Sequence, residues 1–599
     1  MPAHGKLNTV KKRIITYSYS FFLILLIGLS STAFAQQASD LVAPEQGHNN
    51  PFFKQSEVIK PEYASEFIAV TAHPLASQAA YAILNKGGSV MDAMVTAQTV
   101  LGLVEPQSSG LGGGAFTLFY DAQKQILKTF DGRETAPLAS SENLFMSDET
   151  SPMQFFEAVV GGRSVGTPGT VKLLWELHKQ YGKLEWSEVL QPAINMATQG
   201  FRVTPRLAQS VMRDSRNLKQ DPEAAAYFLP HGSAIQTGDI LKNPAYADTL
   251  AKLAKHGGDY FYDSEISKAI IDKVSQSSNK GLLSQADFDS YKLIERSPIC
   301  SAFYRYKVCG MGPPSSGAIA VGQILSLVEH KNIHAYDSEE PLTWQIIAEA
   351  SQLAFADRGQ YLADPDFFNV PQGLLDNSYL KKRSLEITPS KKNKNISFGY
   401  PPGYENKTLQ RGNSPEQEST SHFVLVDKTG NIISMTSTIE NGFGSRLMVK
   451  GFLLNNELTD FSFSPTKGGS LVANRVEAGK RPRSSMAPTI VFKNDKPYLA
   501  LGSPGGSRII NFVAHALIRV LAWNENLQQA FNQAHIINRF GRMEIEQNTH
   551  AASWQAFFEK RAYTTVLQDI NSGLHGVHFT EKGMAGAADK RREGVVIGK

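Results

Sequence analysis

The order of apolar and polar positions divides the N-terminal half of the chain into alternating extended and helical segments. Residues 67–73, FIAVTAH, form an alternating run that predicts a strand. The next two runs, 74–88 and 89–106, predict helices, and the second of these is apolar on most sides and therefore buried. Residues 114–137 then predict a β-hairpin with its turn around 121–125.

Further along, helical stretches separate two groups of strands. Residues 160–290 are mainly helical, and residues 342–362 predict one long amphipathic helix. Strand or hairpin patterns are found in 302–320, 422–439 and 489–504, and a further helix is expected over 508–523. Because the strands come in groups and do not alternate strictly with helices, the pattern favours stacked α and β layers over a doubly wound parallel sheet.

Residues 376–419 interrupt this order. The stretch is polar, rich in Pro, Gly and Asn and without periodicity, so we expect a flexible segment. It ends at Ser419-Thr420, and a well-patterned strand follows at once. A hydroxyl residue is common at such a junction. A hydroxyl residue that becomes a new N-terminus after chain cleavage would occupy the same place.

The first 35 residues have the pattern of a secretory signal peptide. Four basic residues precede a short apolar run, 21–27, and residues 33–35 supply an A-x-A cleavage pattern. The run is shorter than the roughly 20 apolar residues of a spanning helix, which disfavours the alternative of an uncleaved anchor. We therefore expect residues 1–35 to be removed and the protein to be exported to the periplasm or out of the cell, with no membrane segment left.

Export changes the charge balance. The whole chain has a net charge of +4, and the expected leader carries four basic and no acidic residues, so the rest of the chain is neutral. A neutral chain without Lys/Arg blocks is a poor candidate for nucleic-acid binding, which depends on phosphate neutralisation. Cys300 and Cys309 could form a disulfide in an exported protein, and two free thiols are about equally compatible with the sequence.

Several common catalytic and cofactor motifs are missing from the sequence. It has no G-x-S-x-G nucleophile elbow, and His330 and His334 lack the glutamate of an H-E-x-x-H motif, so we expect them to be structural or surface residues. The glycine-rich stretch 110–116 leads into a strand and not into a helix, which disfavours a dinucleotide loop. Two cysteines cannot build a thiolate zinc site. We expect neither a metal nor an organic cofactor.

Thr420 offers a different chemistry. A threonine hydroxyl becomes a strong nucleophile when its own free α-amine is the general base, which requires the residue to be N-terminal. The chain would have to be cut between Ser419 and Thr420. The hydroxyl can make this cut by attacking the preceding carbonyl, which gives an ester that water then opens. On these two residues alone, a plain loop threonine is the simpler interpretation.

Motifs on both sides of the junction strengthen the catalytic interpretation. After the junction lie TSHFVLVDKTGNIISMTSTIENGFGS, GFLLNNELTDFS, KRPRSSMAPTIV and GSPGGSRII, and before it lie HPLASQAAYAILNKGGSVMDA, VEPQSSGLGGGAF, DGRETAP, GTPGT, GMGPPSSG and FADRGQYLADPDF. Over roughly residues 67–599 this series resembles the gamma-glutamyltranspeptidases (glutathione hydrolases). The resemblance implies an N-terminal-nucleophile hydrolase of α+β class, a four-layer αββα sandwich, autoprocessed into a large subunit, 36–419, and a small catalytic subunit, 420–599.

The resemblance also assigns roles to individual residues. The catalytic assignments are Thr420 as nucleophile, Thr438 as the threonine that hydrogen-bonds it and assists self-cleavage, and Gly505 and Gly506 as the backbone donors of the oxyanion hole. The assignments for a γ-glutamyl donor are Arg133, Ser484 and Ser485 for its α-carboxylate, and Glu457 and Asp460 for its α-ammonium.

Three departures from the family pattern concern specificity. Glu440 stands where many members have Asn, at the ammonium-binding end of the site, where it either pairs with the donor's amine or adds an excess of negative charge. The loop between Asp460 and Arg481 is short and contains no Tyr or Trp, so an aromatic lid is not expected. Arg483 replaces the usual Leu beside the two serines.

The activity that the resemblance implies is cleavage of the γ-glutamyl amide bond of glutathione and related compounds. The acyl group would pass through an ester of Thr420 to water, amino acids or peptides, and the two chains would form a heterodimer. One alternative is an acylase of the same fold for glutaryl or β-lactam-type amides. Glu457 and Asp460 disfavour it, because burying acids without an ammonium partner is costly. The other is a non-catalytic periplasmic binding protein for amino acids or peptides, which would not need a cleavable junction.

Overall fold

The computed structural model describes residue 1 and residues 62–389, 391–404, 409–410 and 419–599. The expected signal peptide beyond Met1 and the lead-in as far as residue 61 lie outside the described residues. Within the described residues, none of the helices combines the length and the apolar character that a membrane-spanning segment needs.

Two antiparallel sheets form the centre of the molecule, each with seven strands among the described residues. The first sheet has the order β24 (Val595–Gly598), β2 (Ile68–Thr71), β11 (Ser421–Val426), β12 (Ile432–Thr438), β3 (Gly114–Asp121), β4 (Ile126–Gly132) and β7 (Ile294–Arg296). The second has the order β1 (Glu62–Ala64), β23 (Gly583–Ala588), β22 (His575–Thr580), β18 (Lys496–Gly502), β17 (Thr489–Lys493), β9 (Tyr306–Gly310) and β8 (Ile299–Phe303).

The alternation of side chains along β11 shows how the two sheets pack. Phe423 and Leu425 point to one face of the first sheet and join the core beneath the N-terminal helices. Val424 and Val426 point to the other face and join the core shared with the second sheet. Since both faces of the strand are apolar and buried, β11 lies between a helical layer and a second sheet.

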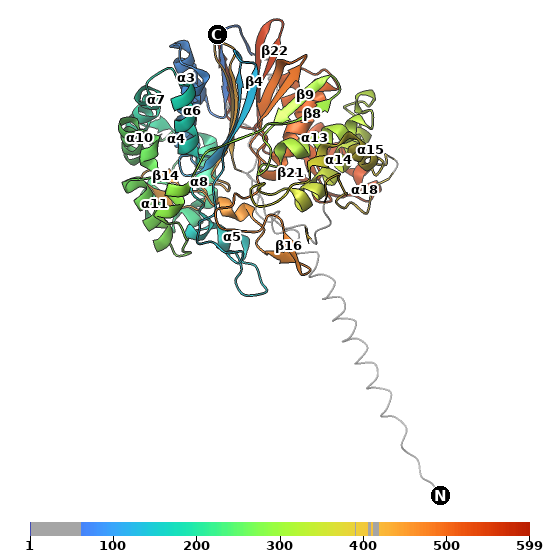
Figure 1. Cartoon of the computed structure of the whole chain (residues 1–599), viewed down its shortest axis with the longest axis horizontal. Helices are drawn as coiled ribbons and strands as arrows, with labels where there is room; N and C mark the ends of the chain where they lie inside the picture. Colours follow the sequence, from blue (N-terminus) through green and yellow to red (C-terminus); the bar gives the residue numbers. More distant parts are fainter. Residues whose placement is uncertain (2–61, 390, 405–408, 411–418) are drawn as a thin grey trace. The chain divides into compact units, whose positions relative to one another are not determined.

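Helices cover the outer face of each sheet (Figure 1). On the side of the first sheet these are α3 (Pro74–Asn85), α4 (Val90–Val104), α6 (Thr170–Tyr181), α7 (Trp186–Gln199), α8 (Pro205–Leu218), α10 (Pro244–His256) and α11 (Glu265–Gln276). On the side of the second sheet they are α13 (Gly317–Glu329), α14 (Pro341–Tyr361) and α16 (Ile509–Leu521). The order of layers is α, β, β, α, which confirms the predicted sandwich.

Shorter elements complete the architecture. The short helices are α5 (Phe155–Val159), α9 (Pro222–Phe228), α12 (Gln285–Ser290), α15 (Asn377–Ser384), α17 (Leu527–Asn532) and α18 (Gln555–Lys560). The small sheets pair β5 (Phe201–Arg202) with β6 (Ile240–Leu241), β13 (Met448–Val449) with β14 (Phe452–Leu453), β20 (Arg542–Glu546) with β19 (Ile536–Ile537) and β21 (Thr564–Gln568), and β16 (Ser470–Val472) with β10 (Leu409–Gln410) and β15 (Thr466–Lys467).

Local sequence accounts well for α4. Its residues are all buried, as the apolar pattern predicts. Ser89 begins the helix with a capping box, in which its hydroxyl accepts a hydrogen bond from the Asp92 amide and the Asp92 carboxylate accepts one from the Ser89 amide. The helix can therefore be buried without leaving its first amide groups unpaired.

The segment predicted to be flexible differs from that expectation over its first part. Residues 377–384 form α15, which buries Tyr379 and Leu380. Asp357 of α14 accepts hydrogen bonds from the Tyr379 hydroxyl and from the Gly399 amide, so residues that lie well apart in this segment are held by one carboxylate. These contacts are tertiary, and the local composition gave no sign of them. Residues 405–408 and 411–418 of the segment lie outside the described residues.

The two cysteines form a disulfide. Cys300 of β8 and Cys309 of β9 stand opposite each other in the antiparallel pair, with their Cα atoms 4.1 Å apart. The bond links the edge strand of the second sheet to its neighbour. Of the two states compatible with the sequence, the disulfide is the one observed.

Candidate active site

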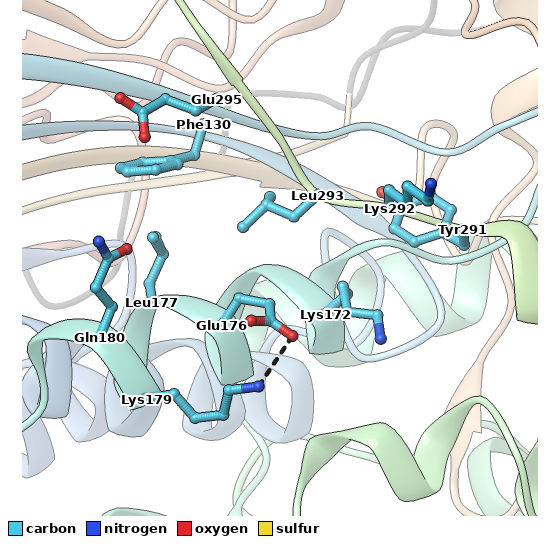
Figure 2. A pocket seen from close by; sticks show the side chains of 10 residues that line it. All are labelled: Phe130, Lys172, Glu176, Leu177, Lys179, Gln180, Tyr291, Lys292, Leu293 and Glu295. Carbon is cyan, nitrogen blue, oxygen red and sulfur yellow. Dashed lines mark hydrogen bonds and ion pairs between the residues drawn. The ribbon is translucent and has the colours of Figure 1, made fainter.

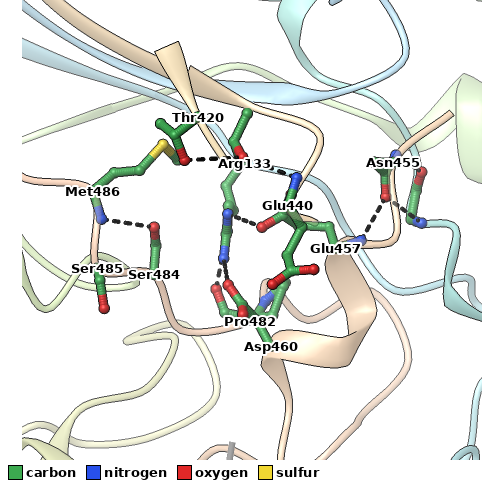
Figure 3. Close-up of polar contacts among 12 residues, drawn as sticks. Arg133, Thr420, Glu440, Asn455, Glu457, Asp460, Pro482, Ser484, Ser485 and Met486 are labelled. Atoms are coloured by element: carbon green, nitrogen blue, oxygen red, sulfur yellow. Dashed lines mark hydrogen bonds and ion pairs between the residues drawn. The ribbon is translucent and has the colours of Figure 1, made fainter. Parts of the chain in front are cut away.

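The predicted nucleophile lies at the end of the central strands of the first sheet. Ser421, the first residue of β11, pairs with Ser437 of β12, so Thr420 stands next to Thr438, the last residue of β12. The Oγ1 atom of Thr420 donates a hydrogen bond of 3.3 Å to Oγ1 of Thr438 (Figure 3). Both side chains are buried. The strand register alone thus brings together the two threonines assigned to catalysis.

A cavity of about 20 Å³ lies beside Thr420. Its lining contains nine of the ten predicted site residues, Arg133, Thr420, Thr438, Glu440, Glu457, Asp460, Ser484, Ser485 and Gly506, together with Ser419, Met486 and Ile509. The tenth, Gly505, is next to Gly506 in the chain. Residues from the β4 end, the β11–β12 pair and the loop before β17 therefore converge on one place, while the role of each residue stays a prediction.

The backbone at the Ser419-Thr420 junction is held on both sides. The Ser419 hydroxyl donates to the Gln107 carbonyl at 2.6 Å, and the Thr420 carbonyl accepts from the Arg592 guanidinium at 3.2 Å. Between these anchors Thr420 has φ of 153°, a conformation that a β-branched residue rarely adopts. Strain of this kind is worth about 1–3 kcal/mol and accumulates at functional sites.

Arg133 forms the centre of the charged part of the cavity. Its guanidinium donates to the carboxylates of Glu457 and Asp460, and to the backbone carbonyls of Pro482 and Arg483 at 3.3 and 3.1 Å. Figure 3 shows the two carboxylates converging on the guanidinium. The groups assigned to the two poles of a γ-glutamyl donor are thus paired with one another. A donor would have to exchange its own charges into these pairs.

Acidic groups outnumber the guanidinium in this region. Glu134 and Glu457 are fully buried, and burial raises the pKa of Glu134 to about 7 although the neighbouring Arg133 acts in the opposite direction. Burial likewise raises the pKa of Glu457 well above 4.5, with Glu134 and Glu440 adding to the effect. Burial therefore favours the protonated form of both Glu134 and Glu457, and the guanidinium of Arg133 acts in the opposite direction.

Glu440 is part of this acidic cluster and contacts Thr438. Its backbone amide donates to Thr438 Oγ1 at 2.9 Å, and its carboxylate accepts from the Asn456 side-chain amide. The residue has φ of 76°, in the left-handed region. The strand that carries Thr438 therefore ends in a turn that directs the Glu440 side chain into the cavity.

Sequence reasoning missed the basic residue behind Ser485. The Arg358 guanidinium, from α14, donates to the Ser485 hydroxyl at 2.7 Å and to the Ser316 hydroxyl at 2.7 Å. The Ser484 hydroxyl accepts from the Met486 amide at 3.1 Å. Arg358 stands in the motif FADRGQYLADPDF, but helical periodicity alone did not distinguish it from a surface residue.

Arg483 is next to the two serines in the sequence, but its side chain does not point into the cavity. It is buried, its amide donates to the Asn474 side chain at 3.0 Å, and its guanidinium donates to the Arg358 carbonyl at 3.3 Å. It is absent from the cavity lining. Its backbone carbonyl, which Arg133 holds, is the part that faces the site.

Gly505 and Gly506 form the turn before α16. Their φ values are 130° and 56°, and a Cβ atom built on Gly505 would lie 2.6 Å from the Phe512 ring. Non-glycine residues are therefore disfavoured at Gly505 by both conformation and space. Arg508, just beyond, pairs with the buried Glu544 at 2.6 Å, which fixes the start of the helix.

His422 is unsuited to be a base for Thr420. It lies two residues further along β11, its Nδ1 contacts Thr436 Oγ1 at 2.8 Å, and burial lowers its pKa well below 6.5. It is a neutral core histidine. His330 and His334 contact Asn377 and Tyr304 near the surface, as expected. Over the described part of the chain no group of His, Cys, Asp and Glu has an arrangement that could hold a metal.

Comparison with known proteins decides the family. The sequence model of the gamma-glutamyltranspeptidase family matches residues 76–599. The chain belongs to the gamma-glutamyltranspeptidase family. The resemblance predicted from the motifs is confirmed, and the chain is an enzyme of this family.

Relatives of two activities are found among the gamma-glutamyltranspeptidase homologues. The glutathione hydrolase proenzyme of Bacillus subtilis (strain 168) is 36% identical over 492 residues, which cover 81% of this chain and 82% of that protein. The acylase ACY 1 proenzyme of Pseudomonas sp. (strain V22) is 31% identical over 547 residues, which cover 90% and 94%. The crystal structure of a cephalosporin acylase from Bacillus halodurans superposes with a TM-score of 0.77 over 92% of this chain and 99% of that one; at 24% identity this shows the shared fold.

The loop that would carry a gamma-glutamyltranspeptidase lid lies between Asp460 and Arg481. It contains the short strands β15 and β16. Its Phe463 is buried and stacks on Phe145, with the ring centroids 4.7 Å apart. Phe463 thus packs against Phe145, and neither Phe463 nor Phe461, the second aromatic residue of this loop, lines the cavity at Thr420.

Proposed function

We propose that this enzyme hydrolyses and transfers γ-glutamyl groups from glutathione and related amides, with Thr420 as its N-terminal nucleophile. The observation that carries the proposal is the charge of the cavity beside Thr420. Four buried carboxyl groups, those of Glu134, Glu440, Glu457 and Asp460, are gathered around one guanidinium. A donor that carries an α-ammonium group brings a second cation to these acids.

The same charge balance bears on the acylase alternative. A glutaryl donor resembles a γ-glutamyl donor without the α-ammonium, so its binding would leave the acidic excess uncompensated. Its carboxylate, which a γ-glutamyl donor also carries, would enter the acidic site without an accompanying ammonium group. Burying unpaired charge is costly. The site therefore favours the γ-glutamyl donor, even though acylases are among the relatives of this chain.

The first step of the proposed mechanism is self-cleavage. The Thr420 hydroxyl attacks the Ser419 carbonyl carbon, its proton passes by way of Thr438 to the Thr420 nitrogen, and the peptide C–N bond breaks as the ester C–O bond forms, which frees the Thr420 α-amine. Water then hydrolyses this ester to give the Ser419 carboxylate and the free Thr420 hydroxyl. The strained φ of Thr420 and the anchored residues on both sides favour attack within this bond.

Turnover then uses the amine that cleavage has created. It accepts the proton of the Thr420 hydroxyl as this attacks the γ-carbonyl carbon of the donor, and the backbone N–H groups of Gly505 and Gly506 stabilise the oxyanion. The leaving amine departs with a proton, and a γ-glutamyl ester remains on Thr420. Water or the amine of an amino acid or peptide then takes the acyl group. Arg133 and the two serines hold the donor's α-carboxylate during these steps.

The proposal includes a processed heterodimer in an exported location. Cleavage would give a small chain beginning at Thr420 and a large chain ending at Ser419. The signal pattern of residues 1–35 supports export to the periplasm, and the disulfide between Cys300 and Cys309 is compatible with an oxidising compartment.

The deciding experiment measures processing and donor choice on the same preparations. Denaturing mass spectrometry of the purified protein should show two chains, and of Thr420→Ala a single chain. The processed protein should cleave γ-glutamyl-4-nitroanilide with a kcat/KM about 10²-fold or more above that for glutaryl-4-nitroanilide, because the second donor brings no ammonium group to the buried acids. Equal or reversed preference would indicate an acylase. A single chain in both proteins would exclude the N-terminal threonine mechanism.

A further inference from the structure

A second cavity, of about 680 Å³, lies apart from the Thr420 site and shares none of its lining residues. It is bounded by the start of α3, by α7, by the β5–β6 pair and by β24. Its walls are largely apolar, and their principal side chains are Leu75, Met196, Phe201, Ile240 and Val595. Its size and its apolar lining match those of pockets that bind small organic molecules.

Two buried polar side chains line this apolar cavity. Glu593 is 7% exposed and His73 is 2% exposed. The His73 Nδ1 atom accepts a hydrogen bond from the Leu75 amide at 3.1 Å, so the proton of the neutral ring resides on Nε2. This Nε2–H group is buried without a hydrogen-bond partner. The cavity therefore offers one carboxylate and one free donor at the end of an apolar chamber.

The electrostatic setting of Glu593 is defined by residues from two helices. Burial raises its pKa to about 7, Arg206 of α8 acts in the opposite direction, and Glu105 at the end of α4 adds to the rise. Thr204 and the Arg206 amide, at the N-terminus of α8, hydrogen-bond the carboxylate. A cation bound in the cavity would stabilise the ionised form of Glu593, because its positive charge offsets the effects of burial and of the negative charge of Glu105.

A third cavity, of about 630 Å³, differs from the apolar cavity in the character of its lining (Figure 2). Its lining is strongly charged, but its charges are largely matched within the protein. Lys179 pairs with Glu176 at 3.3 Å, and Lys172 pairs with Asp259 at 2.8 Å. Glu295 is paired with Lys128 at 3.0 Å. A ligand in this third cavity would have to displace existing ion pairs. In the apolar cavity, by contrast, the buried Nε2–H group of His73 has no hydrogen-bond partner to displace.

We propose that the cavity beneath Ile240 binds a small apolar amine that also carries a hydroxyl or carbonyl oxygen. The ammonium group pairs with the Glu593 carboxylate, and the oxygen accepts the Nε2–H of His73. The apolar body fills the space between Leu75, Met196 and Phe201. Amino alcohols and amino-acid amides with an apolar side chain have this combination of groups. The assignment is independent of the reaction at Thr420, since neither Glu593 nor His73 belongs to that site.

The test is calorimetric titration of the purified full protein with three matched compounds. Phenylalaninol has the amine, the hydroxyl and the apolar ring; 3-phenylpropan-1-ol lacks the amine, and phenethylamine lacks the hydroxymethyl group. We expect phenylalaninol to bind with a Kd below about 1 mM, and loss of the amine to weaken binding at least about tenfold, because a charge-assisted hydrogen bond is lost. Loss of the hydroxymethyl group should weaken it about two- to tenfold.

Two variants locate the binding. Glu593→Gln keeps the size and the hydrogen-bond acceptor but removes the charge, and Ile240→Lys places a repelling cation at the rim, where Ile240 is 55% exposed and has no role in packing the core. Each should weaken phenylalaninol at least about tenfold. Glu295→Gln, in the polar cavity, is the matched control and should leave binding unchanged.

Three results would overturn the proposal. The first is no detectable binding of phenylalaninol at millimolar concentration. The second is equal binding of phenylalaninol and 3-phenylpropan-1-ol. The third is unchanged phenylalaninol binding by Ile240→Lys, which would place the amine elsewhere, for example at the Thr420 site. Because Ile240 lies at the surface, this variant decides the matter even if Glu593→Gln does not fold.

Discussion

Replacing Thr438 by valine removes one hydroxyl beside Thr420 and keeps the branched shape of the side chain. In the structure this oxygen accepts two hydrogen bonds, from Thr420 Oγ1 at 3.3 Å and from the Glu440 amide at 2.9 Å. The variant therefore takes away a partner of the nucleophile and a partner of a buried backbone group. The first loss affects the rate of self-cleavage, and the second affects the free energy of unfolding.

The size of the effect distinguishes two roles for Thr438. A neutral hydrogen bond contributes about 0.5–1.5 kcal/mol, so a residue that merely orients Thr420 would change the rate of self-cleavage about two- to tenfold. A residue that accepts the proton during attack contributes about 10²–10⁴-fold. We expect the larger effect, at least about 10²-fold slower cleavage. The unpaired Glu440 amide should in addition lower the free energy of unfolding by about 1–3 kcal/mol.

The assay is a time course of chain cleavage after purification of the unprocessed protein, followed by denaturing mass spectrometry. Thr438→Ser, which keeps the hydroxyl, is the control and should cleave within about tenfold of the wild-type rate. Urea unfolding of each variant separates lost stability from lost chemistry. Cleavage of a folded Thr438→Val protein within twofold of wild type would refute the assigned role.

Three further predictions address binding, covalent stability and acid stability. Arg133→Gln should raise the KM for γ-glutamyl-4-nitroanilide about 10²-fold. It should also lower the free energy of unfolding by about 3–5 kcal/mol, since it leaves buried acids without their cation. An unchanged KM in a donor titration would contradict the assignment of Arg133 to the donor's α-carboxylate. Replacing Cys300 and Cys309 together by serine should lower the free energy of unfolding by about 2–3 kcal/mol in urea, as expected for a crosslink with a sequence separation of 9. For the buried Glu544, burial raises the pKa but Arg508 and Arg539 outweigh it and lower the pKa from 4.5 to about 2. The stabilisation that ionised Glu544 gives the fold is therefore complete above pH 4.5 and is lost as the pH falls towards 2. Glu544→Gln should flatten the acid-unfolding profile by about 3 kcal/mol over that range. Identical profiles for the two proteins would show that the pairing of Glu544 with the two arginines does not change stability.

Local patterns predicted the parts of the fold whose environment is regular. β11 and α4 could be predicted because their sequences are largely apolar, and a run of this kind predicts burial on every side. α15 was missed because polar and basic residues dominate it, and the carboxylate that anchors it, Asp357, is on another helix. Composition describes a segment, whereas this anchoring depends on a distant residue.

In the candidate site, too, some residues could be predicted from the sequence and others could not. The motifs identified the side chains that line the cavity, because their types suit the chemistry assigned to them. Arg358 behind Ser485 was missed, and so was Glu134, although Glu134 follows Arg133 directly. Their importance comes from burial and from charges supplied by other elements, and one-dimensional spacing does not express either. The excess of carboxylates around Arg133 became evident from the three-dimensional arrangement.

The strand order of the two sheets has a consequence for how the processed enzyme can be made. In the first sheet β11 and β12, which follow Thr420, lie between β2 and β3, which precede it, and in the second sheet β1 and β9 flank a block of four later strands. Cleavage at Ser419-Thr420 would leave every one of these interstrand ladders in place. The two fragments would then be unable to exchange with those of another molecule without breaking both sheets. Separately synthesised fragments would have to co-fold, so under the proposed processing the single precursor chain would serve as the template on which its two fragments are assembled.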